Sequence, residues 1–210
     1  YIKKHMDGVI FAGEVDIRVI EEFRKQSIPV VLVNNYLDMD GLVCISADHY
    51  GGAVQATEYL CKLGHCKIGL LSGRFSPQVS KTLAKYDIPV DDRFIADIEP
   101  ALEDGEEIMT RMLREVDRPT AFFCTNDTIA AGAMKAVTRA GLRVPEDIAI
   151  IGFDDSYISR VVEPELTTVR IDAAKMGCLA MQTLFDLIAG MPVEKAHIQI
   201  PTELIVRGTA

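Results

Sequence analysis

Residues 119–133 read PTAFFCTNDTIAAGA, and this stretch decides the fold. Its first half is an apolar run without a solvated face, which is typical of a strand buried on both sides of a parallel sheet. The apolar residues after Asp127 recur at helical spacing, so we expect a helix to begin there. A buried strand therefore delivers Asn126 and Asp127 to its carboxyl end. Open α/β sheets hold their ligands at that end.

Short β-branched runs alternate with amphipathic segments along most of the chain. This rhythm predicts βαβ units and parallel sheets with helices on both faces, which is an α/β fold. Strands are expected at 7–13, 28–33, 43–46, 67–72, 94–98, 120–125, 148–153 and 166–171, and helices at 15–26, 51–63, 105–116, 127–140 and 173–189. A final extended run at 198–206 carries Pro201.

Three predicted strands end in carboxamides or carboxylates, namely Asn34-Asn35, Asn126-Asp127 and Asp154-Asp155. Such groups suit polyhydroxylated ligands, because a carboxylate accepts from two vicinal hydroxyls and a carboxamide both donates and accepts. The structural alternative is that the second pair supplies a helix N-cap and the third a turn. The coincidence at three strand ends favours a sugar-like or nucleoside-like ligand.

The charge balance and the motifs exclude several classes of function. Thirty-one acidic and 22 basic residues give a net charge of -9, which argues against this chain itself gripping a phosphate backbone. The sequence has no dinucleotide fingerprint, phosphate loop or nucleophile elbow, and its four histidines are scattered. We therefore predict no catalytic residue, no cofactor and no metal site.

Cysteine usage and hydrophobicity bear on the compartment. Five cysteines have an odd count and no zinc-type spacing, so we expect reduced core thiols in a cytoplasmic protein. No run approaches the roughly eighteen apolar residues of a membrane span, and no leader is visible. Because the chain begins at Tyr1 rather than Met, we expect it to be a fragment.

Several motifs, in order, resemble the lactose-repressor/galactose-repressor family of bacterial transcriptional regulators. Residues 119–133 resemble its core motif, and residues 141–155 (GLRVPEDIAIIGFDD) are similar to its most recognisable stretch. Residues 48–69 resemble its first domain crossover, and residues 164–169 and 200–208 match its close. The similarity covers essentially the whole chain.

The resemblance implies the fold of periplasmic sugar-binding proteins. Two Rossmann-like, doubly wound parallel-sheet subdomains are then connected by three crossovers. Residues 1–46 plus 172–200 form the amino-terminal effector subdomain, and residues 47–171 plus 201–210 form the carboxyl-terminal one. The chain opens just before the family's third strand, so we expect the amino-terminal part to be incomplete and the helix-turn-helix DNA-binding domain to be absent.

The resemblance also implies an effector site in the cleft between the subdomains. By family correspondence Asn34, Asn126 and Asp154 fall on positions that contact the effector. Asp127 and Asp48 are weaker candidates.

The implied partners are a small sugar-like effector, operator DNA bound through the absent domain, and a second copy of the chain. Met176, Leu179 and Met181 on the long helix are apolar residues that we expect in a homodimer contact. The alternative is that all three face the core, because helical periodicity does not separate the two cases. We therefore interpret the chain as the effector-binding and dimerisation core of a sugar-responsive transcriptional regulator, a repressor under allosteric control. A periplasmic sugar-binding protein of a transport system is the alternative.

The predicted crossover between the strands at 67–72 and 94–98 is short for this family. Only residues 81–86 look helical there, barely more than one turn. Family members carry an effector-gripping arginine and a glycine-aromatic pair in the first turns of that helix. Here Val79-Ser80 runs straight into Lys81. We expect a segment with that arginine to be missing near Ser80-Lys81.

Overall fold

The computed structural model describes residues 6–35, 37, 39, 41–71, 76–193 and 196–210. The chain divides into two compact units: unit 1 contains Tyr1–Asp48 and Asp172–Pro201, and unit 2 contains His49–Ile171 and Thr202–Ala210. The chain therefore passes between the units three times. Each unit is built on a parallel sheet, which confirms the predicted α/β class. The assignment of these units to effector subdomains stays a prediction.

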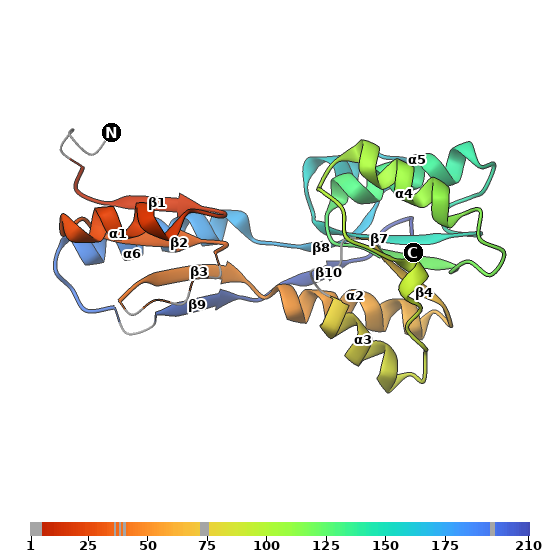
Figure 1. The fold of residues 1–210 in the computed structure, drawn as a ribbon, viewed down its shortest axis with the longest axis horizontal. Helices are drawn as coiled ribbons and strands as arrows, with labels where there is room; N and C mark the ends of the chain where they lie inside the picture. The colour runs from red at the N-terminus through yellow and green to blue at the C-terminus, as the bar shows by residue number, and fades with distance from the viewer. Residues whose placement is uncertain (1–5, 36, 38, 40, 72–75, 194–195) are drawn as a thin grey trace. The chain divides into compact units, whose positions relative to one another are not determined.

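Unit 1 contains a four-stranded sheet of order β1-β2-β3-β9, in which all neighbours are parallel. Its strands are β1 (Val9–Ala12), β2 (Val30–Val33), β3 (Val43–Ala47) and β9 (His197–Ile200). Helix α1 (Ile17–Lys25) buries Ile20 and Phe23 against Leu32 and neighbouring strand residues. Helix α6 (Ala173–Ile188) contacts β1, β2 and β3 (Figure 1).

Unit 2 contains a six-stranded sheet of order β10-β8-β7-β6-β4-β5. Its strands are β4 (Ile68–Leu71), β5 (Ile95–Ala96), β6 (Ala121–Cys124), β7 (Ala149–Asp154), β8 (Thr167–Arg170) and β10 (Glu203–Ile205). Only the pair of β10 with β8 is antiparallel among these strands. From β4 the chain goes first to β5 on one side and then to β6 on the other. This reversal is a topological switch point, and ligands bind beside such points.

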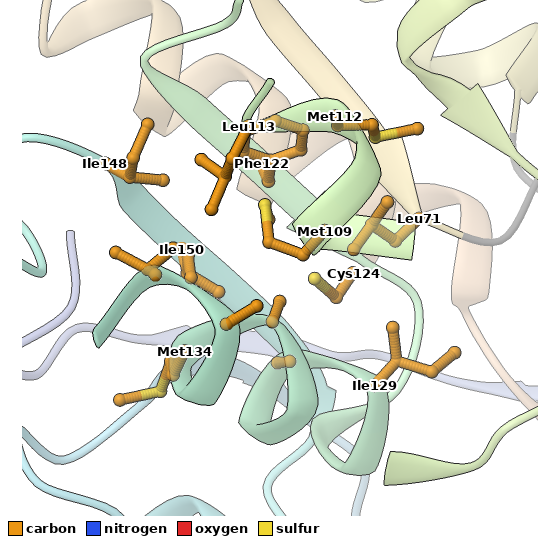
Figure 2. Close-up of a cluster of buried hydrophobic side chains, with 14 of the residues drawn as sticks. Leu71, Met109, Met112, Leu113, Phe122, Cys124, Ile129, Met134, Ile148 and Ile150 are labelled. Atoms are coloured by element: carbon orange, nitrogen blue, oxygen red, sulfur yellow. The ribbon is translucent and has the colours of Figure 1, made fainter. Parts of the chain in front are cut away.

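Helices cover both faces of the unit 2 sheet (Figure 1). Helices α2 (His49–Lys62) and α3 (Ser76–Lys85) lie on one face, and α4 (Leu102–Met112) and α5 (Asp127–Arg139) on the other. Strand β6 supplies both cores, because strand side chains alternate. Phe122 and Cys124 join the α4/α5 cluster shown in Figure 2, whereas Ala121 and Phe123 join the α2/α3 cluster.

Three expected elements differ from the structure. Helix α4 begins at Leu102 rather than at Gly105, so that Glu103 and Asp104 lie in its first turn, where carboxylates are favourable. The strand expected at 94–98 shrinks to β5, after a short 3-10 helix η2 (Asp92–Phe94). The final extended run divides at Pro201 into β9 of unit 1 and β10 of unit 2.

The structure shows no gap near Ser80-Lys81, where we expected a segment to be missing. Helix α3 is continuous over Ser76–Lys85, because Pro77 falls in the first turn, where proline is tolerated. Val79 and Leu83 are buried one turn apart in the α2/α3 core. The helix is thus ten residues long instead of about one turn. Residues 72–75 before it, which include an arginine, lie outside the described residues.

The apolar residues expected at a homodimer contact do not all face solvent. Met176 is buried in the core of unit 1, because it faces the sheet under α6, whereas Met181 is exposed. Within the described part of the chain, no helix is both long and apolar enough to cross a membrane.

Helices α4 and α5 pack so closely that their backbones are in contact. A Cβ at Gly132 of α5 would collide with the carbonyl oxygen of Leu102, and a Cβ at Gly105 of α4 would collide with that of Ile129. Each helix thus presents a glycine to the main chain of the other. This contact fixes the start of α5 and, with it, the residues at the carboxyl end of β6.

The Gly132→Ala variant should therefore unfold more easily than the wild type, although alanine favours a helix. We expect a loss of about 1–3 kcal/mol in the free energy of unfolding, measured by urea denaturation, because the added methyl overpacks a rigid contact. The matched control is Gly177→Ala in α6, where a Cβ meets nothing within 4 Å. That variant should be neutral or stabilised by up to about 1 kcal/mol. Equal effects of the two substitutions would contradict the proposed packing.

Candidate functional site

Asn126 links the ends of β6 and β7. Its Oδ1 accepts hydrogen bonds from the backbone N–H groups of Thr128 (2.7 Å) and Ile129 (3.4 Å), so it is the N-cap of α5. The structural alternative is therefore correct for this oxygen. The Nδ2 group donates to Asp154 Oδ2 at 2.9 Å. The cap thus presents its amide group to the next strand end, at the edge where a ligand is expected.

The backbone at the end of β7 lies in an unfavourable conformation. Asp154 has φ 105° and Asp155 has φ 51°, in the left-handed region that residues with a Cβ seldom adopt. Such strain persists only where surrounding contacts enforce it, and it concentrates at functional sites. In unit 1, Asn34 at the end of β2 also has a positive φ, 53°.

Asp127 holds the loop after β7 through a hydrogen bond from Ser156. The residue is only 1% exposed, and its two carboxylate oxygens accept from the Ser156 N–H (2.7 Å) and from Thr168 Oγ1 (2.5 Å). A Cβ at Gly152 would collide with this carboxylate, so the glycine of β7 makes room for it. Asp127 therefore ties the start of α5 to both β7 and β8.

Asp155 is the centre of a cluster of cations. Its side chain is 3% exposed and accepts from Arg170 Nε at 2.8 Å, from Arg160 at 3.3 Å and from Arg207. Ser159 Oγ also donates to it at 3.1 Å. Its burial acts to raise the pKa, but the hydrogen bonds from Arg207 and Arg170 outweigh this effect and lower the pKa to about 2. Asp155 is therefore ionised throughout the physiological range.

The two carboxyls nearest to Asn126 have the opposite electrostatics. Burial, together with the neighbouring charge of Asp127, raises the pKa of Asp154 to about 7, against the hydrogen bond from Asn126. Burial also raises the pKa of Asp127, against the hydrogen bonds from Thr168 and Ser156. Asp154 can consequently gain or lose a proton near neutral pH, while the adjacent Asp155 cannot.

The other two predicted site residues belong to unit 1. Asn34 follows β2 and donates its backbone N–H to Ile45 at 2.9 Å, and Asp48 follows β3 and donates its own to Ile200 at 2.7 Å. Both lie at carboxyl ends of strands in that unit. The structure thus brings together Asn126, Asp127 and Asp154 within unit 2.

Sequence reasoning missed the polar groups that support these residues. Thr168 is fully buried in β8, and Ser156 and Arg207 reach the site from loops. Thr167-Thr168 could have been noticed, because two hydroxyls within a buried strand need partners. Among the described residues, no three His, Cys, Asp or Glu side chains form a group that could hold a metal ion.

Replacing Asp154 by Asn should make the protein less sensitive to pH. Because folding raises this pKa from 3.8 to about 7, the folded protein keeps a proton at Asp154 between pH 4 and pH 7 that the unfolded chain releases. Wild-type stability therefore falls as pH rises through this window. We expect the free energy of unfolding of Asp154→Asn to rise relative to that of the wild type by up to about 4 kcal/mol between pH 4 and pH 7, measured by urea denaturation.

Asp155→Asn is the contrasting variant, because the pKa of Asp155 is lowered. Its ionisation stabilises the fold above pH 4, and that contribution disappears as pH falls toward 2. The free energy of unfolding of Asp155→Asn should be lower than that of the wild type by about 2 kcal/mol or more at pH 7, and by little at pH 2. If both variants changed with pH in the same direction, the electrostatic assignment would fail.

Comparison with known proteins gives the family. Residues 57–210 match the model of the periplasmic binding protein-like domain. The chain is 34% identical, over 96% of its length, to the probable HTH-type transcriptional repressor ExuR of Bacillus subtilis, and 32% identical, over 99%, to the HTH-type transcriptional repressor CytR of Escherichia coli. It spans 63% and 64% of those two proteins.

Solved structures agree. A regulatory protein of the LacI family from Chloroflexus aggregans superposes with a TM-score of 0.89 at 28% identity, covering 97% of this chain and 76% of that one. The Lac repressor bound to ONPG gives 0.87 at 27%, covering 100% and 66%. A complex of the transcriptional regulator CelR with cellobiose gives 0.90 at 25%, covering 99% and 67%. These relatives are transcriptional regulators, not enzymes. The chain belongs to the periplasmic binding protein-like domain family, as the effector-binding domain of a LacI-family transcriptional regulator.

Proposed function

We propose that the chain is the effector-binding and dimerisation core of a bacterial sugar-responsive transcriptional repressor. The observation that carries the proposal is the contact between Asn126 and Asp154 at the carboxyl ends of β6 and β7. It joins a donor and an acceptor beside the switch point of the unit 2 sheet. The cellobiose bound to CelR supports a sugar as the ligand class.

The residues have different roles in this proposal. Asp154 accepts from ligand hydroxyls, and Asn126 offers a donor beside it. Asp127, whose oxygens are occupied by Ser156 and Thr168, holds the loop rather than the ligand. For Asn34 and Asp48, which belong to unit 1, an effector contact stays a prediction.

The family favours a regulator over the alternative, a periplasmic sugar-binding protein of a transport system. Operator DNA is then bound by a part of the protein outside these 210 residues, because the chain itself carries a net charge of -9. An effector that binds one conformation more tightly than another shifts the operator affinity. Operator binding places the protein in the cytoplasm.

The ligand proposal is tested by calorimetry on a panel of sugars that includes cellobiose, ribose and ONPG. For a sugar that binds, Asp154→Ala should weaken the affinity at least about tenfold, because a charge-assisted hydrogen bond of about 1.5–3 kcal/mol is lost. The matched control is Asp117→Ala, which removes an exposed carboxylate paired with Lys67 before the amino end of β6. The assignment is rejected if both variants bind like the wild type.

A homodimer is the second part of the proposal. Met181, Phe185 and Ile188 lie at i, i+4 and i+7 of α6 and are 45%, 58% and 43% exposed. This spacing puts three large apolar side chains on one solvent-facing stripe. Family membership and this stripe together support pairing with a second copy.

Light scattering should therefore give about twice the 23.1 kDa chain mass. Phe185→Asp should shift the protein toward the monomer, because a charge would be buried in an apolar contact. Val116→Asp, at a fully exposed site in unit 2, should leave the dimer intact. A wild-type monomer at micromolar concentration would argue against the dimer.

A further inference from the structure

The turn at Asp154-Asp155 is held by an ion cluster whose members differ. Arg160, Arg170 and Arg207 all donate to Asp155, with side chains 59%, 42% and 11% exposed. Arg207 is thus the most buried of the three cations. Arg170 is also paired with Glu203 on β10, and Arg207 with Glu165, each at 3.6 Å.

Arg207 makes contacts that the other two do not show. One of its terminal nitrogens donates to the backbone carbonyl of Leu166 at 2.7 Å and to Ser159 Oγ at 3.1 Å, while the other donates to Asp155. The planar guanidinium therefore connects the turn after β7, the 3-10 helix η3 (Tyr157–Arg160) and the segment before β8. A flexible point charge could not hold these three positions together.

The segment that carries Arg207 is itself fixed. Its backbone N–H donates to Thr167 Oγ1 at 2.9 Å, and Gly208 donates to the carbonyl of Glu165 at 2.9 Å. Thr209 exchanges two hydrogen bonds with Ile150 of β7, at 2.6 and 2.8 Å. Arg207 therefore reaches Asp155 from a rigid base.

We propose that Arg207 is a positioning residue that fixes the turn so that the Asp154 carboxyl stays against Asn126. This inference rests on the proposed function, in which Asp154 contacts the effector. Asp154 and Asp155 are adjacent and both have positive φ, so neither can relax without moving the other. Without Arg207, Asp155 would keep only the more exposed cations Arg160 and Arg170, so its carboxylate would shift toward them and toward water. Asp154 would then leave Asn126.

The test is a titration of Asp154 in the protein without effector. Carboxyl ¹³C NMR follows the aspartates, and the Asp154 signal is assigned by its loss in Asp154→Asn. In Arg207→Met the Asp154 midpoint should fall by at least about one pH unit, because the carboxyl becomes solvated. Direct loss of a nearby positive charge would raise the midpoint instead. The direction therefore separates repositioning from simple electrostatics.

Two further variants complete the design. Arg160→Met removes another guanidinium from the same Asp155 but should leave the midpoint unchanged. Arg207→Lys keeps the positive charge but cannot bridge Asp155 and the Leu166 carbonyl together, so it should lower the midpoint, and it decides the matter if Arg207→Met does not fold. A folded Arg207 variant with the wild-type midpoint, or an equal shift in Arg160→Met, overturns the proposal. The titration contains no sugar, so a failed ligand panel leaves its result unaffected.

Discussion

The buried carboxylate of Asp127 is the constraint on which this end of unit 2 depends. A carboxylate removed from water must have its oxygens satisfied, and here the partners are Ser156 in the loop after β7 and Thr168 within β8. The side chain itself sits at the start of α5, whose position is set by backbone contact with α4. Asp127 therefore connects the packed helix α5, strand β8 and the loop after β7. The neighbouring Asn126 and Asp154 acquire their geometry from this arrangement.

Capping and recognition are combined in one side chain. Asn126 uses its oxygen for the helix and its amide group for Asp154, so a serine or threonine could cap α5 without offering the second contact. Asp154 and Asp155 are adjacent carboxylic acids with different properties. Asp154 titrates near neutral pH, and Asp155 titrates only near pH 2. Two identical groups thus differ, because burial and the neighbouring Asp127 raise the pKa of Asp154, whereas hydrogen bonds from guanidinium groups lower that of Asp155.

Sequence periodicity could predict most of the strands and helices. The apolar spacing of β6 and α5, for example, is enough to predict both elements. Periodicity failed where local pattern and tertiary contact disagree. Gly105 looked like a helix start, yet it is a packing glycine inside α4. Pro77 obscured the first turn of α3. At the site, strand ends pointed to Asn126 and Asp154, but no local pattern shows that Arg207, 52 residues after Asp155, reaches it.

The three passages of the chain between the units have a consequence for biosynthesis. Unit 2 is interrupted by residues 172–201 of unit 1, and its edge strand β10 and Arg207 follow that insertion. During synthesis from the amino terminus, the turn at Asp154-Asp155 therefore lacks its contact with Arg207 until both units have been translated. Neither unit is a contiguous piece that truncation could isolate. Nascent chains that stop early would carry a sheet without its closing strand, exposing an edge to other chains.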